Sequence, residues 1–247
     1  DEKVLEKIWD DWRAFASYAF NKSHATCYSW VAYQTAYLKA NYPSQYMAGV
    51  MSRSLADIST VSKLMDECKT MGINTLRPDI NESYLKFSVN HLGDIRFGLG
   101  AIKGVGEGAV ADILRERKAN GPFKSIYDFV ERVNLSSCNR KNMECLGVAG
   151  AFDCFEDLQR EHFVAGTTSG ECFLDALMQY GINYQQDKAT CQMSLFGPTE
   201  MPEIAKPAPQ PVTERWGDME RLNRERELLG IYISGHPLDE YAIVLQN

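Results

Sequence analysis

The sequence predicts a mainly α-helical fold with a small β-hairpin. Apolar residues recur at the three-to-four-residue spacing of helices over most of the chain. The spacing changes to two only within residues 84–99, where the alternating runs SYLKFSV and IRFGL flank the turn sequence NHLGD. Residues 197–213 hold five of the nine prolines, a density that excludes both helix and sheet. The expected elements are therefore helices, one hairpin and one extended linker.

Residues 1–75 are expected to be helical throughout. The first residues, DEKVLEKIWDDW, follow an amphipathic helical pattern without an initiating Met, which indicates a fragment of a longer protein. The next helix ends at Tyr42, because the residue before a proline avoids the helical conformation. Aromatic residues in these helices, such as Trp30, are typical of a protein core. The helices after the first are expected over residues 24–42, 45–55 and 59–71, with Gly72 closing the last.

The rest of the chain divides by composition. Beyond the prolines, Glu220 and Arg224 are spaced to pair on a helix, and GIYISGHPL is typical of a short strand and turn. The expected segments are a connecting hairpin over 76–98, glycine-punctuated helices over 99–155, a helical extension over 156–190, a proline-rich linker over 191–213, and a helix with a strand over 214–247.

Composition and charge exclude several classes of protein. No run of about 18 apolar residues is present, and the first residues lack the apolar core of a signal peptide. The seven cysteines lie far apart without a CxxC pair, which argues against a zinc site or a disulfide framework and favours a reducing cytoplasm. The net charge of −7 conceals a mildly basic middle, because residues 96–145 carry nine basic and six acidic side chains. Nucleic acid therefore stays a candidate ligand.

The stretch LGAIKGVGEGAVADIL, residues 99–114, has the pattern of a helix-hairpin-helix motif. Its glycines allow backbone angles closed to other residues and leave the main chain open to a ligand. Amide groups at the start of the second helix would point outward with the positive end of the helix behind them, which suits a phosphate oxygen. Nearby basic residues, Arg117 and Lys118 among them, would add salt-dependent affinity for DNA. The candidate DNA-binding residues are Lys103, Gly104, Val105, Gly106, Glu107, Gly108 and Arg115.

The stretch FNKSHA, residues 20–25, sets four polar residues directly before a helix rich in aromatic residues. Asn21 or Ser23 can cap that helix by accepting backbone N–H bonds. A cap does not explain Lys22 and His24, because positive charge is unfavourable at the positive end of a helix dipole. The residues alone leave two interpretations open: an ordinary cap beside solvent-facing cations, or a site for a phosphate-bearing ligand.

Several long motifs occur in an order that is typical of one polymerase family. They are FASYAFNKSHATCYSWVAYQTAYLKANYPSQYMAGVMS, DECKTMGINTLRPDIN, FGLGAIKGVGEGAVADIL, GPFKSIYDFVERV, AGAFD and LLGIYISGHPLDEY. On these motifs nearly the whole chain resembles the C family of bacterial replicative DNA polymerases, the DNA polymerase III alpha subunits. The resemblance implies part of a fingers domain over 1–75, a tandem helix-hairpin-helix domain over 99–155, and a lead into an OB domain from residue 214 on.

The resemblance also implies ligands and partners. Lys22 and His24 would contact the triphosphate of the incoming deoxynucleoside triphosphate, with Asn21 and Ser23 as neighbours, and the glycine hairpin would lie on duplex primer-template DNA. Nucleotidyl transfer needs carboxylates that hold Mg²⁺, which in this family belong to a palm domain. No catalytic residue or metal ligand is therefore assigned here. The full-length protein would be a DNA-directed DNA polymerase, and the fragment alone is expected to be inactive.

A second, looser copy of the hairpin is expected in NRKNMECLGVAGAFD, residues 139–153, where Gly147 interrupts the helix and Gly150 ends it. The resembling family usually keeps a helix-forming or apolar residue in place of Gly147. A distorted or weaker second hairpin is therefore expected. Paired hairpins would grip both strands of a duplex.

The pentapeptide QMSLF, residues 192–196, resembles the peptide by which these polymerases bind the sliding clamp. The Gln192 amide would bond at the rim of a pocket that Leu195 and Phe196 fill, and the neighbouring prolines would keep the peptide extended. The clamp and other replisome subunits are thus expected partners. A local hydrophobic anchor that folds back on the domain is the alternative.

Other interpretations of the hairpin also stay open. A plain turn between packed helices needs no ligand, and a non-catalytic helix-hairpin-helix module of a repair protein needs no nucleotide site. A dinucleotide site is disfavoured, because no long buried strand precedes Gly104 and no acidic ribose ligand follows it. A small-molecule enzyme built on His24 is disfavoured as well, since no nucleophile or second base accompanies it.

Overall fold

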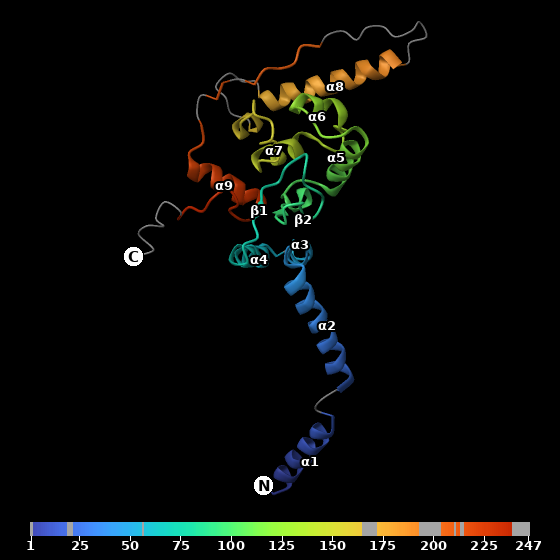
Figure 1. Cartoon of the computed structure of the whole chain (residues 1–247), viewed down its shortest axis with the longest axis vertical. Coiled ribbons are helices and arrows are strands. Elements are labelled where there is room, and N and C mark those ends of the chain that lie inside the picture. The colour runs from blue at the N-terminus through green and yellow to red at the C-terminus, as the bar shows by residue number, and fades with distance from the viewer. Residues whose placement is uncertain are drawn as a thin grey trace. The chain divides into compact units, whose positions relative to one another are not determined.

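The computed structural model describes residues 2–18, 22–55, 57–164, 172–192, 204–209, 211–212 and 215–238. The chain divides into two compact units, residues 1–47 and 48–247 (Figure 1). The described residues are mainly helical with one small sheet, which confirms the predicted fold class. None of their helices is both long enough and apolar enough to cross a membrane. The helices are α1 (Glu2–Tyr18), α2 (Lys22–Asn41), α3 (Pro43–Arg53), α4 (Ile58–Thr70), α5 (Glu107–Asn120), α6 (Ile126–Arg132), α7 (Arg140–Val148), α8 (Phe173–Gln192) and α9 (Asp218–Leu229).

The smaller unit consists of α1, α2 and the start of α3. As expected from the proline rule, α2 ends before Tyr42, and Pro43 is the first residue of α3, where its missing N–H costs nothing. The expectation that the aromatic residues form a core is wrong for this unit, since α2 has no buried residue among those described. The most exposed large apolar side chains include Trp9, Trp12, Tyr28, Trp30 and Tyr33.

Helix α4, the first helix that lies wholly in the larger unit, carries local signals at both ends. The Asp57 carboxylate accepts the N–H of Thr60 and caps the start. At the other end Gly72 has a φ of 73°, and its N–H donates to the Lys69 carbonyl while that of Ile73 donates to Cys68. This pair of bonds is the Schellman arrangement, which requires a left-handed residue and so confirms the predicted role of Gly72.

A three-stranded sheet follows α4. Strands β2 (Ser88–Val89) and β3 (Ile95–Arg96) are antiparallel and confirm the predicted hairpin. The Asn90 side chain closes its turn by accepting the N–H groups of Leu92 and Asp94. Strand β1 (Thr75–Leu76) pairs in parallel with β3, which the sequence did not predict. Strand β1 has only two residues, too few to show alternation of apolar and polar side chains, and its partner strand lies 20 residues further along the chain.

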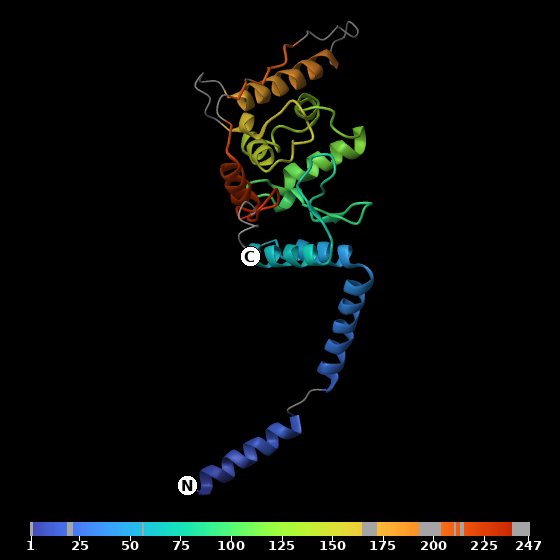
Figure 2. The same cartoon turned by 60° about the vertical axis from the view of Figure 1, so that its left-hand side comes forward.

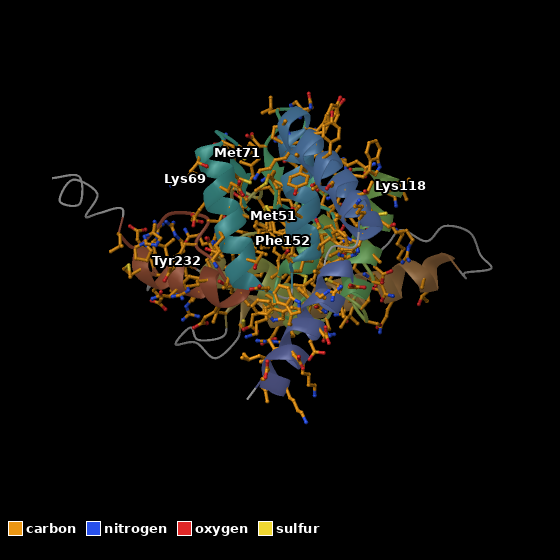
Figure 3. All side chains as sticks on the ribbon, turned by 90° about the horizontal axis from the view of Figure 1, so that it is seen from below. Met51, Lys69, Met71, Lys118, Phe152 and Tyr232 are labelled. Carbon is orange, nitrogen blue, oxygen red and sulfur yellow. The ribbon has the colours of Figure 1, made fainter. Side chains whose placement is uncertain are left out.

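The core of the larger unit is a cluster of phenylalanine rings. The Phe152 ring, labelled in Figure 3, lies 5.2 Å from both Phe129 of α6 and Phe163 of the 3₁₀ helix η2 (Arg160–Phe163), measured between ring centroids. Helix α8 runs along α6 and α7 and adds the fully buried Leu174 and Leu177 (Figures 1 and 2). Through these contacts α6, α7 and α8 share one hydrophobic core.

Gly147 does not interrupt α7, so the expected distortion of this segment is wrong. The helix is continuous from Arg140 to Val148. Gly147 is there because a Cβ at this position would lie 2.1 Å from Cγ of Phe163, so only a hydrogen fits between the helix and the ring. Gly150, with a φ of 84°, ends the helix as predicted, and Ala151 donates its N–H to the Leu146 carbonyl.

The C-terminal segment differs from the expected strand. Helix α9 carries the predicted ion pair, with Arg224 Nη2 and Glu220 Oε1 2.8 Å apart. Beyond it, no strand forms among the described residues up to 238. The N–H groups of Ile233 and Ser234 donate instead to the Glu225 carboxylate, each at 2.8 Å, so they are not available to a sheet.

The proline-rich residues 204–209 form neither helix nor strand, as predicted. They are nevertheless held against α6. The Tyr127 hydroxyl donates to the Pro207 carbonyl at 2.6 Å, and Lys206 Nζ lies 3.7 Å from the Glu131 carboxylate. This part of the linker is therefore a strap fixed to the domain.

A buried ionic network ties α9 to the rest of the larger unit. Glu225 is fully buried and accepts hydrogen bonds from Arg160, which is 7% exposed, and from the hydroxyl and N–H of Ser234. Arg160 also forms a bidentate pair with Asp153, and Asp153 pairs with Arg77 at 3.1 Å. Each charged side chain in this series has a partner of opposite charge, as a buried ionic network requires.

The network predicts an acid-sensitive component of stability. Burial by itself raises the pKa of Glu225, but the hydrogen bonds from Ser234, Ile233 and Arg160 outweigh it and hold the pKa below its ordinary value of 4.5. A depressed pKa in the folded state stabilises the fold above the unfolded pKa, and this contribution is lost as the pH falls below about 4.5. We expect the free-energy difference in urea unfolding between the parent and a Glu225→Gln variant to be largest at neutral pH and to shrink below that point. A pH-independent difference would contradict this.

Candidate nucleic-acid interface

The predicted hairpin is a tight turn that joins a short helix to α5. The helix before it is a single 3₁₀ turn, η1 (Leu99–Ala101), rather than the full helix that the motif suggested. The Val105 N–H donates to the Ile102 carbonyl at 3.1 Å, and Gly104 between them has a φ of 89°. Such an angle strains any residue with a side chain, so the first glycine is required by the turn itself.

The hairpin presents its main chain to solvent. Ile102 and Val105 are buried and anchor it, whereas Lys103, Gly104 and Gly106 are exposed. Glu107 and Gly108, in the first turn of α5, are exposed as well. No atom lies within 4 Å of a Cβ built on Gly106 or Gly108. The predicted residues from 103 to 108 therefore form one continuous open surface, apart from the Val105 anchor.

The start of α5 has unused hydrogen-bond donors. Gly106 is its N-cap residue and has no side chain with which to cap the helix. The first N–H groups of a helix have no carbonyl partner within it, and they carry the positive end of the helix dipole. The Gly106 N–H itself is taken by the side chain of Asn142 at 3.1 Å. The N–H groups that follow it can thus receive an anion from solvent.

A second turn, at residues 133–139, joins α6 to α7, and this turn is referred to below as the second hairpin. The sequence suggested a second hairpin over residues 139–153, a stretch that begins with the cap of α7 and contains the whole helix. The second hairpin adjoins the first. Asn142 of α7 accepts the Gly106 N–H and donates to the Ser137 carbonyl at 2.9 Å, so one side chain links both hairpins. A Cβ on Gly104 would lie 2.7 Å from Sγ of Cys145, which fixes how closely the two segments pack. Helix α7 is capped by the Asn139 side chain, which accepts the Asn142 N–H.

Two lysines project at this junction. Lys103 and Lys141 are exposed, and neither forms an ion pair with any residue that the structure describes. The end of the Lys141 side chain passes Gly104, since its Cε would lie 3.9 Å from a Cβ there. Sequence reasoning missed Lys141, because only the packing of α7 against the hairpin brings it near Lys103. The sequence feature that could have pointed to Lys141 is its place in the first turn of a predicted helix, where anions tend to bind.

The other predicted cations are less available. Arg115 is exposed but pairs with Asp112 at 2.5 Å. A hydrogen bond from Ser137 holds the pKa of Asp112 below its ordinary value, so the carboxylate that pairs with Arg115 is stabilised in its charged form. Arg117 donates to the Ile80 carbonyl at 2.8 Å and lies over the Tyr84 ring, so it serves the fold. Lys118 is exposed at the far end of α5.

The predicted nucleotide-binding residues belong to the smaller unit. Lys22, Ser23 and His24 all lie exposed in the first turn of α2, which contains no acidic residue. The His24 ring packs on the Tyr28 ring with centroids 4.3 Å apart. Asn21 lies outside the described residues, as do Leu195, Phe196 and the side chain of Gln192 in the clamp-like peptide.

The interface is an open surface and not a pocket. The larger unit has a polar groove of about 800 Å³ between the end of α4 and the segment after α9. Lys69 and Tyr232, labelled in Figure 3, stand on its two walls. None of the predicted site residues lines it. Among the residues that the structure describes, no group of three or more His, Cys, Asp and Glu side chains is placed to hold a metal ion.

Comparisons with known proteins identify a motif and several relatives. A family model described as a helix-hairpin-helix motif matches residues 72–162. Over 98% of its length the chain is 40% identical to the DNA polymerase III subunit alpha of Vibrio cholerae, and over 99% it is 42% identical to that of Treponema pallidum. The Mycobacterium tuberculosis protein of the same name is 37% identical over 98% of the chain. The chain spans about a fifth of the length of each of these relatives.

Proposed function

The chain is homologous over nearly its whole length to a segment of bacterial DNA polymerase III alpha subunits, and we propose that it is the part of such a polymerase that holds duplex DNA. The observation that carries this proposal is the open start of α5. There the exposed residues Gly104, Gly106 and Gly108 lie beside Lys103 and Lys141, neither of which has an ion-pair partner among the residues that the structure describes.

The proposed ligand of this surface is the phosphate backbone. Free N–H groups at a helix start and two nearby lysine side chains match a phosphate oxygen in charge and in hydrogen bonding. Gly106 and Gly108 carry no side chain that could contact a base edge, and they bring the ligand directly to the main chain. Binding of this kind does not depend on sequence and weakens steeply with salt. That behaviour suits a polymerase, which must follow any duplex.

The start of α2 is proposed to contact the triphosphate of the incoming nucleotide. Lys22 and His24 supply positive charge in a helical turn without a carboxylate, and Asn21 and Ser23 adjoin them. An anion there would remove the conflict between these cations and the helix dipole. The exposed aromatic side chains of α1 and α2 are the surface expected where other parts of a longer polymerase pack.

The remaining partners follow from the same proposal. The chemistry would be DNA-templated DNA synthesis in the cytoplasm, with Mg²⁺ held by carboxylates in another part of the polymerase. The peptide at residues 192–196 would bind the sliding clamp, and further replisome subunits would contact the whole protein. Similarity to polymerases over α1 to α4, outside the matched motif, favours this function over a repair-type hairpin module.

Duplex binding measured against salt tests the proposal. Gly106→Val fits the observed backbone, with a φ of −79°, and its side chain would stand in the open space where the phosphate is expected. We expect it to lower duplex affinity by about tenfold. Lys103→Ala should reduce the slope of log affinity against log salt by about one ion, as expected for one lost phosphate contact.

Lys118→Ala is the matched control, because this lysine is equally exposed but lies at the other end of α5. It should change neither affinity nor slope. Equal binding by the parent chain and the Gly106→Val and Lys103→Ala variants would remove the hairpin from the DNA interface.

A further inference from the structure

The hairpin proposed to contact DNA is hydrogen-bonded through its main chain to the end of α9. The Lys103 N–H donates to the Leu228 carbonyl at 2.9 Å. The last carbonyls of a helix have no partner within it, so the hairpin closes the end of α9 in the way a capping residue would. A lysine whose side chain faces solvent thus has its main chain fixed by a helix more than 120 residues further along the chain.

Glu225 fixes that end of α9. It lies three residues before Leu228, on the same helical face, and is fully buried. Its Oε1 accepts the N–H groups of Ile233 and Ser234, and its Oε2 accepts Arg160 and the Ser234 hydroxyl. The carboxylate therefore binds the body of the domain on one side and the segment after α9 on the other.

We propose that Glu225 is a positioning residue for the DNA-contacting hairpin, and that it couples residues 231–235 to the placement of Lys103. The coupling runs from the amides of Ile233 and Ser234 to Glu225, along one turn of α9 to the Leu228 carbonyl, and from there to the hairpin. Movement of the segment after α9 would then change the grip on DNA. The part of the proposal that concerns DNA rests on the proposed function above.

The hydrogen bonds around Glu225 predict the effect of substituting it. Both carboxylate oxygens face donors, so in Glu225→Gln one pair of donors must meet the amide NH₂ group. The buried side chain keeps its size, so we expect the last turn of α9 to shift without leaving a cavity. Ser234→Ala is milder, because it removes only the hydroxyl donor. Glu220→Gln is the matched control, since Glu220 is on the same helix and, among the residues that the structure describes, pairs with Arg224 and not with the buried network.

Amide hydrogen exchange, resolved by residue, tests the coupling in the folded chain. We expect Glu225→Gln to speed exchange of the Lys103 N–H by about tenfold or more, and Ser234→Ala to do so by less. The N–H of Phe129, which donates to Ser125 within α6, should exchange as in the parent. Glu220→Gln should leave both unchanged. An unchanged Lys103 N–H in Glu225→Gln, or equal acceleration at Lys103 and Phe129, would overturn the proposal in favour of a purely structural role.

Duplex affinity of the same variants completes the test. We expect Glu225→Gln to weaken binding by about threefold to tenfold, with Ser234→Ala between it and the parent. Rapid Lys103 exchange with unaltered DNA affinity would overturn the link to DNA, while the positional coupling would stand. If the parent itself failed to bind duplex, the proposed function would fall and the exchange result would still decide the coupling.

Discussion

Arg160→Ala is expected to destabilise the larger unit by about 3–5 kcal/mol, the largest effect of any single substitution considered. Removal of this side chain leaves the fully buried Glu225 without a cation, and Asp153 loses its bidentate partner. The cost comes mainly from the uncompensated buried carboxylate and not from the lost attraction. Urea unfolding followed by far-ultraviolet circular dichroism measures it.

The control for this prediction is Arg221→Ala, which breaks an exposed pair with Asp218 on α9 and should cost about 0–1 kcal/mol. Low pH gives a second check. Without the cation Glu225 protonates more readily in the folded state, so the cost of Arg160→Ala should shrink as the pH falls towards 4. A cost below about 1 kcal/mol at neutral pH would show that Glu225 does not depend on Arg160.

Gly147→Ala is expected to destabilise the same unit by about 3 kcal/mol, although alanine is the better helix former. The added methyl would lie 2.1 Å from Cγ of Phe163, and that ring is stacked on Phe152 with no free space to retreat into. Thermal and urea unfolding should both register the loss.

Gly49→Ala provides the comparison, because Gly49 also lies inside a helix but has no atom within 4 Å of a Cβ. There the same substitution should stabilise by about 0.4–1 kcal/mol. A neutral Gly147→Ala would mean that the Phe163 ring moves aside easily, and that contact with this ring does not require a glycine at position 147.

Local signals in the sequence predicted local structure well. Pro43, Gly72 and Gly150 each act within one turn of chain, so their consequences are visible without knowing the fold. The same holds for the hairpin glycines. The interpretation of Gly147 as a helix breaker is wrong because its role depends on tertiary packing. The Phe163 ring leaves no room for a side chain at this position, and no residue near Gly147 in the sequence indicates that the ring will pack there.

The parts of the site that sequence could not supply are the ones made by packing. Lys141 lies near Lys103 only because α7 packs against the hairpin. Glu225 is connected to the hairpin only through the end of α9, where the Leu228 carbonyl accepts the Lys103 N–H. The expected strand after α9 was wrong for a related reason. Its apolar residues suit a sheet, but a buried carboxylate takes the N–H groups a sheet would need.

The two hairpins differ in how their helices begin, and this makes them unequal as holders of a double strand. Asn139 already occupies an amide at the start of α7, so an anion there competes with the protein's own side chain, whereas Gly106 leaves α5 without such a competitor. If the proposed function holds, the strand at α5 would meet main-chain amides that no side chain of the protein occupies, whereas the strand at α7 would have to compete with Asn139 for them. The two hairpins would then contribute unequally to the affinity for a duplex.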